Sequence, residues 1–137
     1  MSILIDTSIW SLALRRHRRD LNPAERAVVL HCRELIIKGE ANLIGAICQE
    51  ALSGIPDKKV FEQVRQRLLL MDELPTTLDT HILAAEFYNV CRAHGTAGGP
   101  IDMTICAAAH LHNAPIFTTD PDFGFYARHL PITLHTI

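Results

Sequence analysis

The sequence predicts an α/β domain with a mainly parallel central sheet. Four short apolar runs, at residues 2–5, 42–44, 115–119 and 132–134, have the continuous pattern of strands that are buried on both faces. Longer segments with apolar residues at helical spacing separate these runs along the chain. With 137 residues, 48% of them hydrophobic, the chain has the size and composition of one well-packed domain. We therefore expect a single domain over residues 1–137.

The first strand ends at an acid and leads directly into a helix. Residues 6–8, Asp-Thr-Ser, have side chains suited to capping a helix that carries Trp10. Asn22 is a good N-cap for the next helix, and Glu25 stands at the capping-box position. Gly39 is expected to end that second helix.

Four further helices are predicted after the second strand. Their apolar residues recur at helical spacing over residues 47–52, 60–71, 79–94 and 101–113. The apolar face of residues 60–71 is compatible with packing on the core or in an interface. Trp10 is likewise compatible with stacking on a base or with packing, and its apolar neighbours favour packing.

Composition and charge exclude several classes of protein. The net charge of −2 excludes a chain that is basic all over, so any nucleic-acid binding must be local. The sequence contains no run of 18 apolar residues, and the first apolar run is short and ends at an acid. We therefore expect neither a membrane span nor a signal peptide. Four cysteines without a CxxC pair are typical of reduced thiols, which predicts a cytoplasmic protein.

Four acids occupy positions that are unusual for solvated side chains. Asp6 and Asp120 each follow a strand at the carboxyl edge of the predicted sheet, where ligands bind in parallel sheets. Asp102 lies at the start of a helix, whose dipole favours a carboxylate. Glu50 lies in an otherwise apolar stretch and is placed to face inward. Each acid alone is explained as a cap, whereas four together predict a shared pocket.

Carboxylates gathered in one pocket repel one another, and a divalent cation offsets that repulsion. A site with only oxygen ligands favours Mg²⁺ or Mn²⁺ over Zn²⁺. The acids by themselves do not specify a reaction.

Four segments in order along the chain carry a family resemblance. They are residues 6–8 (DTS), 50–54 (EALSG), 102–109 (DMTICAAA) and 118–123 (TTDPDF). In this order and separation they resemble the PIN-domain nucleases, most closely the VapC-type toxins of toxin–antitoxin pairs. One departure is Cys106, where the family more often has alanine, and both side chains are small.

The resemblance implies a three-layer α/β/α sandwich and a Mg²⁺- or Mn²⁺-dependent endoribonuclease that hydrolyses single-stranded RNA. It implies that the catalytic acids are Asp6, Glu50, Asp102 and Asp120. The metal ligands among these acids are expected to be Asp6, Asp102 and Asp120. A secondary part in the pocket is expected for Ser8, Thr118 and Asp122. The resemblance also implies a small antitoxin partner and a homodimer.

The one dense basic run lies at residues 15–19 and contains Arg15, Arg16, Arg18 and Arg19. Its position after the first helix suits a contact with RNA phosphates, and a solvated helix end explains it equally well.

Two other classes of protein deserve comparison. A receiver-type phosphoacceptor domain has this length and element order but needs a lysine near its last strand. Here the lysines are at positions 38, 58 and 59, which argues against that class. A non-catalytic PIN-like domain that binds RNA or protein is the second, and it would be expected to lack some of the pocket acids.

Overall fold

The computed structural model describes residues 1–15 and 18–137. At its centre is a four-stranded sheet with the order β3-β2-β1-β4, in which all paired strands run parallel. The strands are β1 (Ile3–Ile5), β2 (Ala41–Leu43), β3 (Asp72–Glu73) and β4 (Ile116–Phe117). Leu4 of β1 pairs with Asn42 on one side and with Ile116 on the other. The predicted parallel sheet is therefore confirmed.

Helices cover both faces of this sheet. Ile3, Leu4 and Ile5 are all at most 2% exposed. Because successive side chains of a strand point to opposite faces, a strand buried at every position is covered on both sides. The molecule is thus the predicted α/β/α sandwich.

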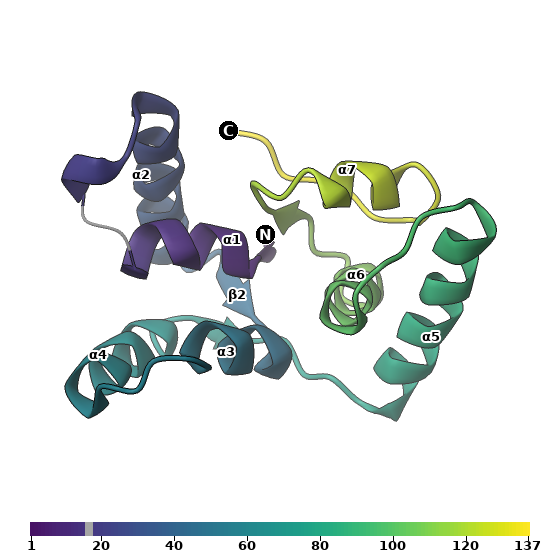
Figure 1. Cartoon of the computed structure of the whole chain (residues 1–137), viewed down its shortest axis with the longest axis horizontal. Helices are drawn as coiled ribbons and strands as arrows, with labels where there is room; N and C mark the ends of the chain where they lie inside the picture. Colours follow the sequence, from purple (N-terminus) through teal and green to yellow (C-terminus); the bar gives the residue numbers. More distant parts are fainter. Residues whose placement is uncertain (16–17) are drawn as a thin grey trace.

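The helices form groups around the strands (Figure 1). Those that precede β2 are α1 (Thr7–Trp10), the π-helix η1 (Ser11–Arg15), the 3₁₀ helix η2 (Arg18–Asp20) and α2 (Pro23–Ile37). Those that follow are α3 (Gly45–Leu52), α4 (Lys58–Leu68), α5 (Leu78–Ala93), α6 (Pro100–Leu111) and α7 (Asp122–Ala127). In Figure 1, α5, α6 and α7 lie across the strands from α2 and α4. Within the described residues, none of the helices combines the length and apolar character needed to cross a bilayer.

Local sequence signals account for the start and end of α2. The side chain of Asn22 accepts a 2.8 Å hydrogen bond from the Glu25 backbone N–H, and the Glu25 side chain accepts one of 3.0 Å from the Asn22 N–H. This is the predicted capping box. Gly39 follows the helix with φ +72°, a conformation that glycine adopts without strain.

The helix α6 is the most deeply buried helix segment near the sheet. Residues 103–109 are all buried, and four of them in a row are cysteine or alanine (Cys106–Ala109). Small side chains allow close approach of a helix to its neighbours, here α5 and α3. The first turn of α6, which carries Asp102, is therefore held firmly by the core.

Three elements differ from the expectations. The strand β3 consists of two exposed residues with no apolar pattern, and the short helix α7 was not expected. The strand expected at residues 132–134 is wrong, because this segment makes only one isolated parallel bridge, between Leu134 and Ile116. Pro131, directly before it, has no backbone N–H to extend the pairing.

Candidate active site

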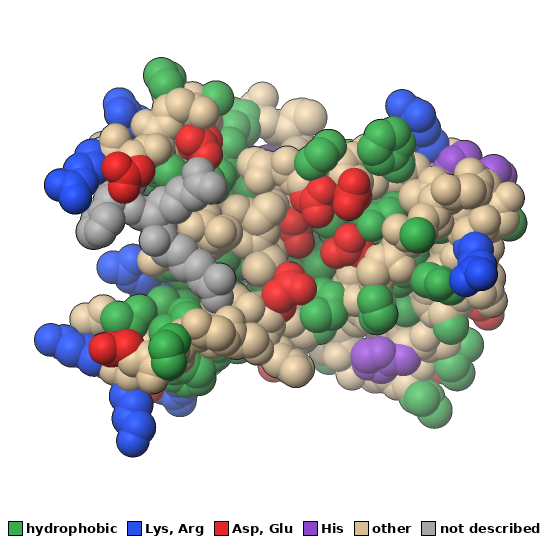
Figure 2. Space-filling model, viewed as in Figure 1, with side chains coloured by type: hydrophobic (Ala, Val, Ile, Leu, Met, Phe, Trp, Pro, Cys, Tyr) green, Lys and Arg blue, Asp and Glu red, His purple; other side chains and the backbone are tan. Residues whose placement is uncertain are grey.

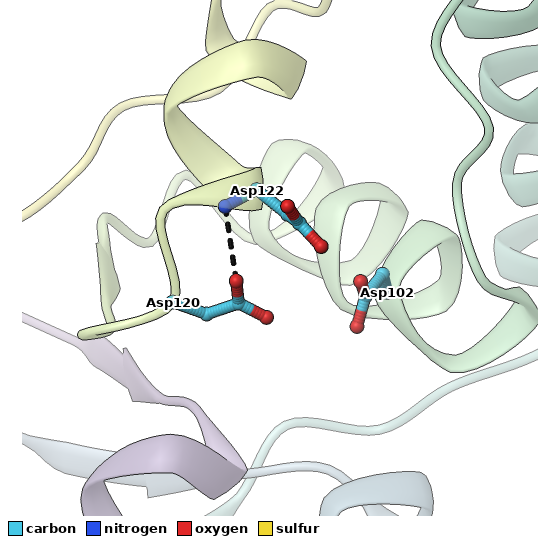
Figure 3. Close-up of side chains that lie close together, drawn as sticks. All are labelled: Asp102, Asp120 and Asp122. Carbon is cyan, nitrogen blue, oxygen red and sulfur yellow. Dashed lines mark hydrogen bonds between the residues drawn. The ribbon is translucent and has the colours of Figure 1, made fainter.

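Three carboxylates from two helices and a loop meet at one point. Asp102 is in the first turn of α6, Asp122 is the first residue of α7, and Asp120 lies in the loop between β4 and α7. One carboxylate oxygen from each lies within 4.8 Å of the others (Figure 3). We refer to Asp102, Asp120 and Asp122 as the acidic cluster.

The loop that carries Asp120 is fixed by hydrogen bonds of its own. Oδ1 of Asp120 accepts a 2.9 Å bond from the backbone N–H of Asp122, drawn as the dashed line in Figure 3. The backbone N–H of Asp120 in turn donates to the Thr118 hydroxyl over 3.0 Å. Among the described residues, none hydrogen-bonds to Oδ2 of Asp120. That oxygen is free to act as a ligand.

Asp6 lies at the end of β1, caps α1 and is only 4% exposed. Its Oδ2 accepts 2.8 Å hydrogen bonds from the hydroxyls of Ser8 and Thr118. Because Thr118 also accepts from the Asp120 N–H, one hydroxyl joins the two strand-end acids. Ser8 and Thr118 therefore brace the pocket.

Glu50 and Asp6 lie outside the acidic cluster. Glu50 is half-buried on α3, where it lines a small cavity with Thr7 and Trp10. Its charge nevertheless contributes to the raised pKa of Asp102, so it acts on the same pocket. The structure thus groups two of the four predicted acids tightly with Asp122, and arranges Asp6 and Glu50 around them.

Burial and crowding raise the pKa of the Asp102 carboxyl from 3.8 to about 6. Loss of solvent is the largest cause, and the hydrogen bond from Tyr126 opposes it. The charges that raise this pKa further belong to Asp6, Asp120 and Glu50. The pKa rises although a helix N-terminus favours the carboxylate, so burial and repulsion outweigh that dipole.

No protein cation neutralises these acids within the described residues. No lysine or arginine forms an ion pair with the acidic cluster there. Acidic side chains gather near the middle of the face in Figure 2, whereas the lysine and arginine side chains stand at its periphery. A compact all-oxygen donor set without a counter-charge fits a hard divalent cation such as Mg²⁺ or Mn²⁺.

The comparisons with known proteins agree with this geometry. A family model described as PIN domain matches residues 3–128. The chain belongs to the PIN domain family. A comparison with curated proteins found no match.

Several solved structures share the fold of this PIN domain. FitAcB from Neisseria gonorrhoeae superposes with a TM-score of 0.70 at 20% identity, over 98% of this chain and 96% of that one. VapBC2 from Rickettsia felis, bound to a DNA fragment from its promoter, gives 0.75 at 16% identity, over 98% of each chain. DNA-bound VapBC from Salmonella typhimurium gives 0.71 at 13% identity, over 98% of this chain and 97% of that one. At these identities the likeness concerns the fold alone.

Tyr126 is a site residue that the sequence analysis missed. It lies on α7, is 1% exposed, and its hydroxyl donates a 2.8 Å hydrogen bond to Oδ2 of Asp102. Burial and this hydrogen bond raise the pKa of the Tyr126 hydroxyl, so it stays a donor. The signal for it was the spacing of Phe123 and Tyr126 directly after the Asp-Pro-Asp segment.

The basic run is only partly visible in this PIN domain. Arg16 lies outside the described residues, and the side chains of Arg15 and Arg18 are not described. Arg19 is exposed in η2. A contact between this run and RNA stays a prediction.

Proposed function

We propose that this PIN domain is a metal-dependent endoribonuclease that hydrolyses single-stranded RNA and acts as the toxin of a toxin–antitoxin pair. The observation that carries the proposal is the acidic cluster, whose crowding is expressed in the raised pKa of Asp102. A cluster of this kind is costly unless a cation binds it. Shared fold with FitAB and VapBC structures supports the toxin role.

The metal would be held by Asp6, Asp102 and Asp120, with Asp122 as a further carboxylate. A bound Mg²⁺ or Mn²⁺ supplies Lewis acidity to the scissile phosphate and to the attacking water. Glu50 is proposed to orient that water or to hold a second ion. We expect products with 5′-phosphate and 3′-hydroxyl ends.

The neighbouring hydroxyls keep the proposed ligands in position. Thr118 and Ser8 donate to one oxygen of Asp6, which leaves Oδ1 for the ion. Tyr126 does the same for Asp102 by occupying Oδ2. Such outer partners fix the orientation of a ligand and its charge. Phosphate contacts from Arg15, Arg16, Arg18 and Arg19 are proposed to hold the RNA beside the site.

The proposed antitoxin has a matching surface. An apolar groove of about 310 Å³ lies between α1, η1, α2 and the end of α4. Two of its lining side chains, Ile37 and Leu70, are 85% and 70% exposed. A helix of a partner protein with apolar residues on one face fits such a groove. An arginine of that partner could then pair with the acids in place of the metal.

A homodimer and a location in the cytoplasm complete the proposal. The competing function is a non-catalytic PIN-like domain that binds RNA or protein. The presence of every proposed pocket acid favours catalysis, because a binding module needs no uncompensated carboxylates.

The test is cleavage of an unstructured RNA by protein in Mg²⁺, Mn²⁺ or EDTA. We expect cleavage only with metal. Asp102→Asn and Asp6→Asn should each lower the rate by at least about a hundredfold, since even outer partners of a metal are worth roughly ten- to a hundredfold. Glu86→Gln, which removes an exposed acid on α5, is the matched control. Equal cleavage by wild type and both aspartate variants would show that the activity belongs to a contaminant and leave the binding-module function.

A further inference from the structure

A second, smaller cavity borders the acidic site. It has a volume of about 120 Å³ and lies between α1, η1, α3 and α4. Its lining residues are Thr7, Trp10, Ser11, Leu14, Glu50, Ala51 and Val64. Thr7 directly follows Asp6, so the cavity opens beside the proposed metal ligands. Since a water molecule occupies about 30 Å³, the cavity has room for the edge of a planar ring.

Two polar atoms of this cavity have no partner. Within the described residues, neither Oγ1 of Thr7 nor Nε1 of Trp10 forms a hydrogen bond, although both atoms are buried. Trp10 is only 3% exposed, and its ring belongs to the hydrophobic core. Buried donors are almost always paired, so an unpaired pair of this kind in one cavity indicates a missing occupant.

The third polar group on the wall is the Glu50 carboxylate. The indole N–H of Trp10 can only donate, an ionised carboxylate can only accept, and the Thr7 hydroxyl can do either. The complementary occupant therefore presents an acceptor and a donor on the same edge. It must also be flat enough to enter between α1 and α3.

We propose that this cavity binds one nucleobase of the RNA substrate and selects bases with a carbonyl oxygen next to a ring N–H. Guanine and uracil have this edge, adenine has no carbonyl, and cytosine has an unprotonated nitrogen beside its carbonyl. The Trp10 N–H donates to the carbonyl, and Glu50 accepts from the ring N–H. Single-stranded RNA exposes these edges, so proteins can discriminate bases there. The inference rests on the proposed function only in taking RNA as the ligand.

The first experiment uses the fact that Trp10 is the single tryptophan of the chain. Its indole N–H gives one signal in a ¹⁵N–¹H NMR spectrum of the full-length protein. The protein, in EDTA, is titrated with GMP, UMP, AMP, CMP and ribose 5-phosphate. We expect saturable shifts of this signal with GMP and UMP, and much weaker ones with AMP and CMP.

Three results would overturn the inference. They are an unmoved indole signal, an equal response to all four bases, and an equal response to ribose 5-phosphate. The first is expected if only water fills the cavity or if a protein side chain is its natural occupant. Because EDTA removes the metal, these outcomes are independent of whether the protein cleaves RNA.

A variant tests the polar contact itself. Thr7→Val removes the hydroxyl without changing the shape, and should weaken GMP binding by about two- to tenfold, the value of one hydrogen bond. The melting temperature should not fall, because the lost hydroxyl has no partner in the described protein. Thr133→Val, the same change at an exposed threonine, should leave both quantities unchanged.

Trp10→Phe is the second variant, since it keeps an aromatic ring and removes the N–H. In a folded sample we expect GMP and AMP to bind about equally. Retained preference for GMP in both variants would contradict the assignment. The same preference should appear in cleavage of a random RNA pool as enrichment of guanine and uracil at a fixed position near the cut. That enrichment should disappear in Thr7→Val.

Discussion

The Tyr126 hydroxyl donates a 2.8 Å hydrogen bond to Oδ2 of Asp102 and so connects α7 to the first turn of α6. These two helices carry two of the three carboxylates of the acidic cluster. A hydrogen bond to the charged form of a carboxyl lowers its pKa. Tyr126 therefore opposes the burial and repulsion that raise the pKa of Asp102 to about 6.

Replacing this tyrosine should change how metal binding depends on pH. In Tyr126→Phe the carboxylate of Asp102 loses its donor, so its pKa rises above about 6. Protons and the metal compete for the same carboxylate. We expect Mn²⁺ affinity, measured by calorimetry, to fall by roughly tenfold near pH 6.5 and to recover toward pH 8.

The matched control is Tyr88→Phe, the same change at the other tyrosine of the chain. Its hydroxyl accepts from Arg92 on the surface of α5, and Mn²⁺ affinity should be unchanged. A loss in Tyr126→Phe of equal size at pH 6.5 and pH 8 would argue that Tyr126 acts on geometry rather than on the pKa of Asp102.

The sequence could predict the parts of the fold that depend on local pattern. The apolar run at residues 3–5 predicts a fully buried strand, and Asn22 with Glu25 predicts the capping box of α2. Placing Asp6 and Asp120 after strands of one parallel sheet predicts that they approach each other. Both sets of residues interact with near neighbours in the chain or with the sheet, so periodicity and caps are sufficient.

The remainder depends on tertiary contacts that leave no local pattern. The strand β3 has two exposed acidic residues and exists only because it pairs with β2. The helix α7 is six residues long, too short for a reliable period. The contact between Tyr126 and Asp102 joins residues 24 positions apart on different helices. No spacing rule predicts which side chain reaches the acid.

Neutralising one acid of the cluster should separate stability from metal binding. Asp120→Asn removes a charge that raises the pKa of Asp102 and keeps the oxygen that accepts from the Asp122 N–H. In EDTA we expect a melting temperature at or above that of wild type, because repulsion is reduced.

The metal response of Asp120→Asn should be the reverse. A metal at a hundred times its Kd stabilises a folded site by about 2.7 kcal/mol, and this gain should vanish in the variant. Thermal melts of both proteins in EDTA and in Mn²⁺ measure this directly, with Glu86→Gln as an exposed-acid control. A lower melting temperature of Asp120→Asn in EDTA would mean that this acid stabilises the loop rather than strains the pocket.

The Thr118 hydroxyl should matter for both stability and metal affinity. It donates to Asp6 and accepts from the Asp120 N–H, so Thr118→Val leaves two buried polar groups without a partner. A hydrogen bond to a charged group is worth roughly 1.5–3 kcal/mol, which is the expected loss in the free energy of unfolding. Thr118→Ser keeps the hydroxyl and should recover most of it. If valine and serine variants unfold alike in urea, the methyl group rather than the hydroxyl is important.

A pair of histidines holds the C-terminal segment against α2. The Nε2 atoms of His31 and His135 are 2.7 Å apart, with ring planes within 9° of each other, and both rings meet Phe117 edge-on. One Nε2 must donate and the other accept, so the contact requires an unprotonated nitrogen. Glu34, 3.5 Å from Nδ1 of His31, favours the proton on His31.

Acid should therefore loosen this segment. Burial and the charge of His31 lower the pKa of His135, against the opposing charge of Glu40. A histidine whose pKa is lower in the folded state contributes stability above its unfolded pKa of about 6.5, and this contribution is lost as the pH falls below that value. We expect backbone order parameters of residues 133–137 to decrease between pH 7.5 and pH 5.5. In His135→Gln they should hardly depend on pH, whereas His81→Gln, at an exposed position of α5, should behave as wild type. Order parameters that stay constant in the wild type would mean that the backbone bonds of Ile116 to Thr133 and His135 hold the segment without the histidine pair.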